Sequence, residues 1–292
     1  MRLHLVDGTY ELFRAHFSKR PDRADRDGHD VKATVGLVNG LLQLIEDEQE
    51  QVTHLAVAFD NPIESWRNVR FPPYKDGSGV DPALLAQFDR VEAAVRALGV
   101  TVWSMRDQEA DDALGTAALR FADAVDQVRI LTPDKDLGQV VRGQRIVQVD
   151  RLRGKFYDED GVRERLGVSP TSVPDLLALV GDTADGIPGL KGFGKVGAAT
   201  VLTRYPHLED IPADAGAWDV EVRGAARLAA TLVERRDDAL LYRELATLVT
   251  DVPLPESLDD LAWAGADPVA WAAFCDEVAS DSLRERPTTW SA

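Results

Sequence analysis

Residues 3–8 read Leu3-His4-Leu5-Val6-Asp7-Gly8, a short apolar run that ends on an acid and a glycine. Two later runs have the same form: residues 54–59 end at Asp60, and residues 127–131 end shortly before Asp134. Short apolar runs flanked by polar turn residues are typical of buried strands. The sequence therefore predicts three strands that are each followed by an acid.

Helical patterns separate these runs. Apolar residues recur at helical spacing over 33–45, 81–98 and 111–122, and a further strand is expected over 100–103. Strands that alternate with helices of ten or more residues form parallel sheets covered on both faces. The sequence therefore predicts an α/β fold with a mostly parallel central sheet flanked by helices.

Beyond about residue 168 the pattern becomes helical. Helices are expected over 172–180, 198–205 and 224–245, and a glycine-rich turn lies at 189–197. Trp271 and Phe274 indicate a packed helix near the end of the chain. We therefore expect an α/β core over 1–167 and a helical subdomain over 168–292.

Composition and charge exclude several classes of protein. The 292 residues are 45% hydrophobic and 28% charged, which excludes disordered and disulfide-scaffold chains. The single cysteine, Cys275, cannot form an internal disulfide, and no signal peptide or membrane span is recognisable. We therefore expect a cytoplasmic protein without a membrane partner. The net charge of −17 argues against binding nucleic acid by bulk charge alone.

Nine acids follow the predicted strands or lie in polar turns. They are Asp7, Asp60, Glu109, Asp111, Asp112, Asp134, Asp136, Asp182 and Asp185. Ligands of open parallel sheets bind at the carboxyl ends of the strands, so we expect these acids to converge. An acid that follows a strand is, taken alone, more often a helix cap or a turn residue than a ligand. Their joint occurrence favours a shared site.

A converging set of carboxylates needs positive charge to neutralise it, because like charges repel and raise one another's pKa. Oxygen ligands without clustered histidine or cysteine favour Mg²⁺ or Mn²⁺ over Zn²⁺. Two such ions roughly 4 Å apart catalyse phosphodiester hydrolysis in many enzymes. The acids therefore predict a two-metal hydrolytic centre.

The glycine-rich turn is a candidate phosphate-binding element. Gly189, Gly192 and Gly194 precede an apolar helix, and Lys191 and Lys195 add positive charge. Exposed amides at a helix start bind anions, although a turn that merely joins two helices has the same composition. It is not a Walker A loop, because no Ser or Thr follows the lysine.

Aromatic and basic residues alternate between Trp66 and Lys75. Such a pattern is expected of a segment that stacks on single-stranded nucleic acid, and it includes Tyr74. A loop packed on the edge of the domain remains the alternative. Arg14, one helix after Asp7, is explained either as a solvated helix residue or as part of the site.

Taken together, these motifs resemble the 5′ nuclease family, which includes flap endonucleases and the 5′-3′ exonuclease domain of bacterial DNA polymerase I. The matching stretches are residues 5–9, 57–60, 74–75, 109–112, 132–137 and 181–189. The resemblance implies a resolvase-like core with an arch segment near 62–85 and a helix–three-turn–helix motif in the helical subdomain. No polymerase domain follows, so we expect a stand-alone form.

The resemblance also implies residue roles. The nine acids match the metal ligands of the family, and Arg14 and Lys75 match basic residues that engage the scissile phosphate. The glycine turn of the family holds a monovalent cation, often K⁺, against duplex phosphate, which implicates Gly192 and Gly194. We therefore expect a monomeric Mg²⁺- or Mn²⁺-dependent enzyme. Its expected partners are DNA with a 5′ flap, nick or 5′ end and, beyond DNA, replication or repair proteins at the nucleoid.

The sequence departs from the family pattern in three places. Ser78 stands where the arch usually has an arginine, Gly186 stands where an asparagine is usual, and Lys195 comes one place early in the glycine turn. The departures concern arch threading and duplex binding rather than the hydrolytic centre.

Three other functions share some of these motifs. A non-catalytic protein of the same fold that binds branched DNA is the main alternative, and a nuclease directed at RNA is another. A phosphatase with an aspartyl nucleophile needs an acid two residues before Asp7, where this chain has Leu5.

Overall fold

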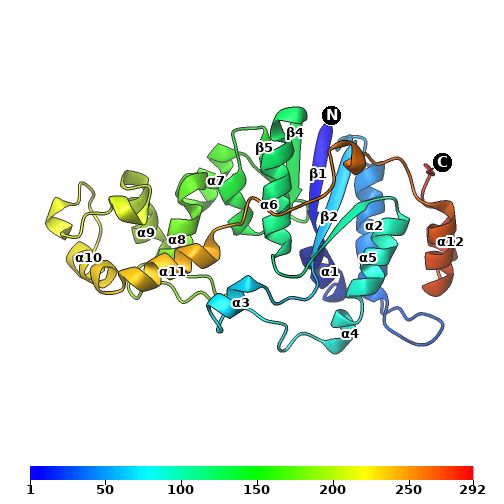
Figure 1. Cartoon of the computed structure of the whole chain (residues 1–292), viewed down its shortest axis with the longest axis horizontal. Helices are drawn as coiled ribbons and strands as arrows, with labels where there is room; N and C mark the ends of the chain where they lie inside the picture. Colours follow the sequence, from blue (N-terminus) through cyan, green and yellow to red (C-terminus); the bar gives the residue numbers. More distant parts are fainter. Residues whose placement is uncertain (292) are drawn as a thin grey trace. The chain divides into compact units, whose positions relative to one another are not determined.

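The computed structural model describes residues 1–291, which fold into two compact units (Figure 1). Unit 1 comprises residues 1–65, 77–132 and 250–291. Unit 2 comprises residues 66–76 and 133–249.

Unit 1 is an α/β structure built on four parallel strands. They are β1 (Arg2–Asp7), β2 (His54–Asp60), β3 (Thr101–Met105) and β4 (Gln127–Leu131), in the spatial order β3-β2-β1-β4. Its helices are α1 (Gly8–His16), α2 (Lys32–Glu46), α4 (Pro82–Leu85), α5 (Phe88–Ala97), α6 (Ala110–Phe121), α12 (Pro268–Glu277) and α13 (Asp281–Arg284). The predicted class, a mostly parallel sheet flanked by helices, is confirmed.

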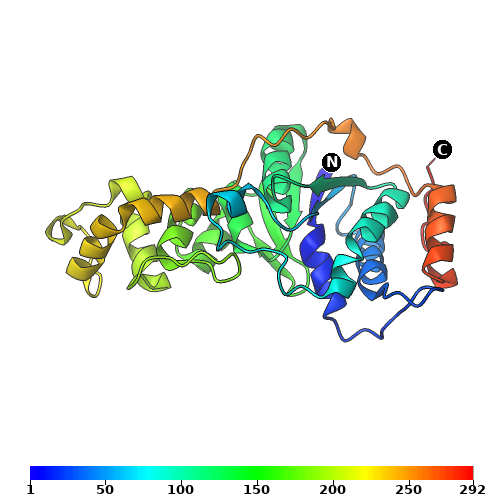
Figure 2. The ribbon, with the colours of Figure 1, turned by 60° about the horizontal axis from the view of Figure 1, so that its bottom comes forward.

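The strand order determines where a ligand can bind. The chain moves from β1 to β2 to β3 in one direction and then crosses back to β4 on the other side of β1. Right-handed crossovers therefore place α1, α2 and α5 on one face and α6 on the other. Helix α6 contacts all four strands, opposite α2 and α5 (Figures 1 and 2). The order reverses between β1 and β4, and α/β proteins commonly bind ligands at the carboxyl ends of strands at such a point.

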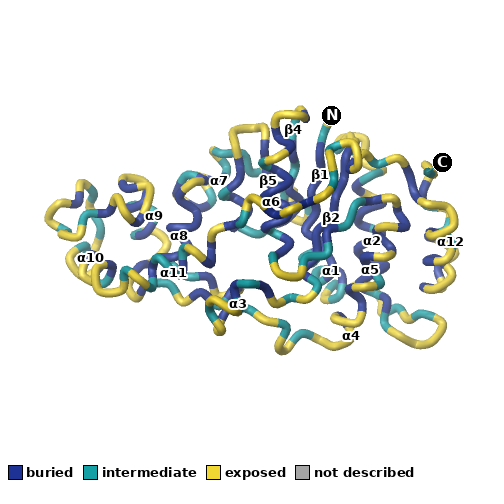
Figure 3. The backbone as a smooth tube through the Cα atoms, in the orientation of Figure 1, coloured by how far each residue is buried: buried dark blue, intermediate teal, exposed yellow. Residues whose placement is uncertain are grey.

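Unit 2 is mainly helical. It contains α3 (Trp66–Arg70), α7 (Glu159–Leu166), α8 (Val173–Val180), α9 (Lys195–Arg204), α10 (Ala225–Glu234) and α11 (Arg236–Ala246). An antiparallel hairpin of β5 (Ile146–Asp150) and β6 (Lys155–Tyr157) precedes α7. Helix α8 is almost wholly buried at the centre of the unit, packed against α9 and α11 (Figure 3). The expected helical character beyond residue 168 is confirmed.

Two predicted helices are each divided in the structure. The segment 81–98 forms α4 and α5, separated at Gln87, whose buried side chain accepts hydrogen bonds from the backbone and hydroxyl of Thr34, each of 3.0 Å. The segment 224–245 is interrupted at Arg235, where the backbone leaves the helical region. Both predictions of a continuous helix were wrong. The apolar residues keep helical spacing on either side of each break, so the sequence pattern does not reveal where the helix is interrupted.

The last residues form part of unit 1. Trp271 is fully buried and Phe274 is 5% exposed on α12, which packs against α5. Arg286 pairs with Glu46 of α2 at 2.8 Å. The predicted packed helix is confirmed. No helix within residues 1–291 is long and apolar enough to cross a membrane.

A buried polar cluster links β1 to β4 and titrates in the acid range. The Nε2 atom of fully buried His4 lies 3.0 Å from Oε2 of Glu50, and Nη1 of Arg129 lies 2.6 Å from the same oxygen. The hydrogen bond with His4 is the main reason that the pKa of Glu50 falls to about 2, and burial lowers the pKa of His4. Both folded-state pKa values are depressed, so the cluster stabilises the protein at neutral pH.

We expect this stabilisation to disappear on acidification. The contribution of His4 is lost as the pH falls below about 6.5, and that of Glu50 is lost as the pH falls from about 4.5 towards 2. The variant Glu50→Gln should lose about 1 to 2 kcal/mol of unfolding free energy at pH 7, because the carboxylate is partly exposed. Urea denaturation between pH 7 and pH 3 should show this difference shrinking. The exposed Glu48→Gln is the control, and a constant difference for Glu50→Gln would contradict the assignment.

Candidate active site

Two buried acids stand at the carboxyl ends of β1 and β2 in unit 1. Asp7 is 7% exposed and accepts hydrogen bonds from the Tyr10 amide at 2.8 Å and from the Thr132 hydroxyl at 2.9 Å. Asp60 is 9% exposed and accepts from the Ala110 amide at 2.7 Å. These bonds hold Asp7 beside the end of β4 and Asp60 beside the start of α6.

The start of α6 adds further acids to the same end of the sheet. The Glu109 amide donates to Asp112 at 3.0 Å, and the Ser65 hydroxyl donates to Glu109 at 2.7 Å. Asp112 is fully buried, whereas Asp111 is half-buried. Glu109 and Asp112 form a capping box, so these acids do cap a helix as well as gather near the strand ends. Capping and a place in the site are therefore compatible roles.

A cleft of about 270 Å³ opens beside Asp60 within unit 1. Its lining includes Asn61, Glu64, Gly77 and Phe88. The carboxyl end of β2 is therefore reached from solvent through a partly polar opening.

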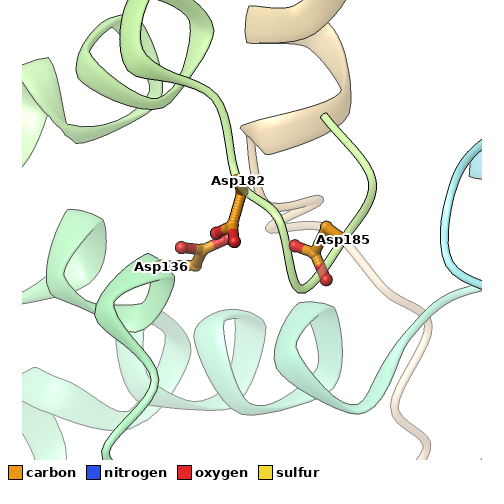
Figure 4. Close-up of side chains that lie close together, drawn as sticks. All are labelled: Asp136, Asp182 and Asp185. Carbon is orange, nitrogen blue, oxygen red and sulfur yellow. The ribbon is translucent and has the colours of Figure 1, made fainter. Parts of the chain in front are cut away.

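A second group of acids lies in unit 2. Asp136, Asp182 and Asp185 each offer a carboxylate oxygen, and these oxygens all lie within 4.8 Å of one another. Figure 4 shows Asp136 and Asp182 turned toward each other, with Asp185 beside them. Asp134 begins the 3₁₀ turn that carries Asp136, and its side chain accepts from the Asp136 amide at 2.9 Å. The four acids that the sequence places in this unit thus come from two adjoining turns.

Asp136 is the least compensated member of this group. It is 6% exposed, and its Oδ1 atom has no hydrogen-bond partner among the described residues. Burial and the negative charges of Asp134 and Asp185 raise the pKa of the Asp136 carboxyl well above its ordinary value. An unpartnered buried carboxylate oxygen is costly unless a cation binds it. The donor set, oxygen only, fits Mg²⁺ or Mn²⁺.

A closed turn presents two of these acids. Asp182 and Ile187 exchange two backbone hydrogen bonds of 2.8 Å, and the Asp182 carboxylate accepts from the Ala184 amide at 3.0 Å. Lys135 donates a hydrogen bond to the Asp182 carboxylate. Burial lowers the pKa of Lys135, but the charge of Asp136 and the bond to Asp182 outweigh it and raise the pKa overall.

Lys75 is fixed to the same turn by main chain and side chain. Its amide donates to the carbonyl of Asp185 at 2.9 Å, and its Nζ atom lies 3.0 Å from Oδ1 of Asp185. Asn68 donates to the carbonyl of Lys75 at 2.8 Å. Gly186 permits this approach, because it has φ of +76° and a Cβ atom there would lie 2.5 Å from the carbonyl oxygen of Pro73. The glycine in place of the usual asparagine therefore has a steric explanation.

We expect Gly186→Ala to destabilise the protein. A methyl group would meet Pro73 and occupy a backbone conformation that favours glycine, so the loss should be about 1 to 3 kcal/mol. Gly154→Ala is the matched control, because Gly154 also has positive φ but faces open space. Equal losses in the two variants, measured by urea denaturation, would show that the close approach to Pro73 does not matter.

Arg14 lies on α1, the helix that Asp7 caps. Its Nε atom donates to Glu11 at 3.0 Å, and both side chains lie close to Gly40 of α2. Burial lowers the pKa of Arg14, but the hydrogen bond and charge of Glu11 outweigh it and raise the pKa overall. Arg14 is thus a fixed positive charge on the helix that begins at the site of unit 1.

The glycine-rich turn of unit 2 joins α8 to α9. Gly189 has φ of +68°, and a Cβ atom there would lie 2.4 Å from the Gly181 amide, so this position requires glycine. Gly192 also has positive φ, and Gly194 begins α9 facing open space. Lys191 is exposed, whereas the Lys195 ammonium donates to the carbonyl of Arg165 at 2.9 Å, in the last turn of α7. Lys195 therefore has a structural partner that the sequence did not indicate.

The aromatic and basic stretch near Lys75 is mostly packed within unit 2. Tyr74 is 4% exposed, and Arg67 is 2% exposed and donates to the carbonyl of Leu245 at 2.8 Å. Arg70 pairs with Glu244 at 3.0 Å. The expected platform for base stacking is not presented by these side chains, because packing and ion pairing occupy them. The alternative of a packed loop fits the structure.

Comparisons with known proteins show the family of the chain. The family model for the 5′-3′ exonuclease N-terminal resolvase-like domain matches residues 2–167, and that for the 5′-3′ exonuclease C-terminal SAM fold matches residues 168–269. The chain belongs to the 5′-3′ exonuclease family. The border between the two matches falls where the sequence pattern changes, whereas residues 133–167 fold compactly with the helices of unit 2.

The relatives of this exonuclease family member differ in length, and the chain covers a different share of each. It is 38% identical over 268 residues to DNA polymerase I of Pseudomonas aeruginosa, covering 89% of this chain and 28% of that protein. It is 29% identical over 260 residues to a 5′-3′ exonuclease of Aquifex aeolicus, covering 89% of this chain and 86% of the other. The chain spans between 26% and 32% of the length of the polymerase relatives that it matches.

The exonuclease fold is also shared with a solved structure. The bacteriophage T5 D15 flap endonuclease, in a pseudo-enzyme-product complex with DNA and metal ions, superposes with a TM-score of 0.65 at 16% identity. The superposition covers 98% of this chain and all of that chain. At this identity the comparison shows the fold.

Sequence reasoning missed several residues that hold the site together. Thr9 accepts from the Asp60 amide at 2.8 Å, Thr132 donates to Asp7, and Lys135 donates to Asp182. Thr9 and Thr132 lie within the stretches that carry the family resemblance. The sequence therefore indicated these segments, but it did not predict the hydrogen-bond partners of the two threonines. The signal for Lys135 was its place between Asp134 and Asp136.

Proposed function

We propose that this member of the 5′-3′ exonuclease family hydrolyses DNA phosphodiester bonds at 5′ ends and 5′ flaps. The observation that carries the proposal is the buried Oδ1 atom of Asp136, which has no hydrogen-bond partner among the described residues and lies in a group of three converging carboxylates. Such an arrangement is unfavourable in a protein that never binds a cation there. Family membership supplies the reaction class.

We propose that the nine acids, five in unit 1 and four in unit 2, are metal ligands and that Mg²⁺ or Mn²⁺ is the cofactor. In unit 2, Asp136, Asp182 and Asp185 would hold an ion through carboxylate oxygens. In unit 1, Asp7, Asp60 and Glu109 offer buried carboxylates at the carboxyl ends of the strands and at the start of α6. Divalent ions bound by carboxylates supply Lewis-acid activation of water and of the phosphate.

The basic residues of the proposal act on the phosphate. The Lys75 ammonium is held beside the carboxylate group of unit 2 by Asp185, where it would stabilise negative charge that develops on a phosphate oxygen. Arg14 offers a guanidinium held by Glu11 on the helix that follows Asp7. Both cations are held in place by carboxylates before substrate binds, which lowers the reorganisation that the reaction requires.

The glycine-rich turn is proposed to bind duplex DNA. Gly192 and Gly194 leave the backbone open at the start of α9, and exposed Lys191 supplies positive charge for phosphate. The neighbouring side chain of exposed Arg227 would extend this surface, since it lies near Gly192. A K⁺ ion at the turn is part of the proposal. Recognition would rest on the shape of the DNA, because few of these groups read base edges.

The test is cleavage of end-labelled 5′-flap, nicked, blunt and single-stranded substrates with Mg²⁺ and with EDTA. The proposal expects Mg²⁺-dependent products from the 5′ strand of the flap and nicked substrates. Binding without cleavage would favour the alternative of a branched-DNA-binding protein. A preference for RNA flaps in competition would favour an RNA-directed nuclease. The action of the protein as a monomer at the nucleoid, with replication or repair proteins, belongs to the same proposal.

A further inference from the structure

Lys135 lies inside the carboxylate group of unit 2. Its Nζ atom donates a hydrogen bond to Asp182 and lies 3.7 Å from Oδ1 of Asp136, the oxygen without a hydrogen-bond partner among the described residues. The Lys135 side chain is one-third exposed, whereas those of Asp136 and Asp182 are less than one-tenth exposed. The ammonium therefore reaches the buried carboxylates from the solvent side.

The position creates a competition between two cations. Three carboxylates whose oxygens lie within 4.8 Å of one another repel, and a nearby ammonium relieves part of that repulsion. Both carboxylate oxygens of Asp182 are already engaged, Oδ2 by the Lys135 ammonium and Oδ1 by the Ala184 amide, so an ion that binds Asp182 competes with these donors. An ammonium cannot share a carboxylate oxygen with a divalent ion without like-charge repulsion. An ion bound close to Asp182 therefore weakens or displaces the contact with Lys135.

We propose that Lys135 is a positioning residue that serves as an internal counter-cation for the carboxylate group and sets its affinity for divalent metal. Lys135 keeps Asp182 and Asp136 in place while the group is free of metal. Because metal binding weakens or breaks the contact between Lys135 and Asp182, the affinity for metal is lowered by the free energy that this contact loses. The inference rests on the proposed function for the identity of the metal. Lys75 pairs with the third acid of the group, Asp185, so Lys135 is the ammonium that contacts Asp182 and Asp136.

The test is a calorimetric titration of the full chain with Mn²⁺ in the absence of DNA. Lys135→Met should bind Mn²⁺ about tenfold more tightly at the site of Asp136 and Asp182. Lys135→Arg keeps the positive charge and should stay within about twofold of the wild type. Lys155→Met, an exposed lysine of β6, is the matched control for loss of one charge from unit 2. Unchanged or weaker Mn²⁺ binding by Lys135→Met would overturn the proposal.

Thermal unfolding in EDTA gives a second readout. Lys135→Met should lower the melting temperature of the metal-free protein, and saturating Mg²⁺ should restore it. The same substitution made in Asp182→Asn should lower the melting temperature less than half as much, because the contact is already lost. Equal losses in both backgrounds would contradict the inference. Neither measurement uses DNA, so a failure to cleave flaps would overturn the proposed function and leave the result for Lys135 standing.

Discussion

Asp136→Asn should lower kcat for flap cleavage by at least about 10³-fold while leaving duplex affinity within about threefold. The substitution keeps the shape of the side chain and removes a carboxylate ligand from the group formed with Asp182 and Asp185. Duplex binding is proposed for the glycine-rich turn, which lies outside the substituted side chain. Single-turnover cleavage and equilibrium binding of the same labelled flap measure the two effects separately.

The same variant should also be more stable than the wild type when metal is absent. Burial and neighbouring acids raise the pKa of Asp136 in the folded protein, so the ionised form destabilises the metal-free fold at neutral pH. Asparagine resembles the protonated form, and the melting temperature in EDTA should rise. The exposed Asp160→Asn is the control for loss of a negative charge from unit 2. If Asp136→Asn turns over the flap substrate as fast as the Asp160→Asn control, Asp136 is not a metal ligand that the reaction requires.

Lys75→Ala should reduce kcat by about 10²-fold with a smaller effect on DNA affinity. The ammonium lies 3.0 Å from Asp185, so the structure places positive charge beside the carboxylate group before substrate arrives. A charge that acts on the developing phosphate negative charge affects kcat more than binding.

The control for this prediction is Lys155→Ala, which removes an exposed lysine of unit 2. Equal reductions of kcat and affinity in Lys75→Ala would reduce Lys75 to a simple phosphate contact. If Lys75→Ala lowers the melting temperature as much as Gly186→Ala does, the Lys75 side chain mainly holds the 66–76 segment on the turn of Asp182 and Asp185.

The parallel sheet and the acids at its strand ends were predictable from sequence for one physical reason. Parallel strands end at the same edge of the sheet. The position of an acid that directly follows an apolar run, such as Asp7 or Asp60, can therefore be predicted without knowledge of side-chain contacts. The turn of Asp182 and Asp185 was different, because nothing in strand periodicity connects it with Asp136. That connection came from the family resemblance, and the structure shows the three carboxylates together.

Other features depended on contacts between residues distant in sequence. At the break in 81–98, Gln87 accepts a buried hydrogen bond from Thr34, and Lys195 of α9 donates to the carbonyl of Arg165 on α7. The hairpin of β5 and β6 could have been recognised. Apolar residues at Val147 and Val149 precede a turn that ends with Gly154, which is a usual hairpin signal.

The most direct test of the metal centre is anomalous diffraction from crystals of the wild type soaked in Mn²⁺. We expect an anomalous peak within coordination distance of carboxylate oxygens of Asp136, Asp182 and Asp185, and the loss of that peak in Asp136→Asn. A protein that cleaves flaps in Mn²⁺ yet shows no peak beside these three carboxylates would contradict it.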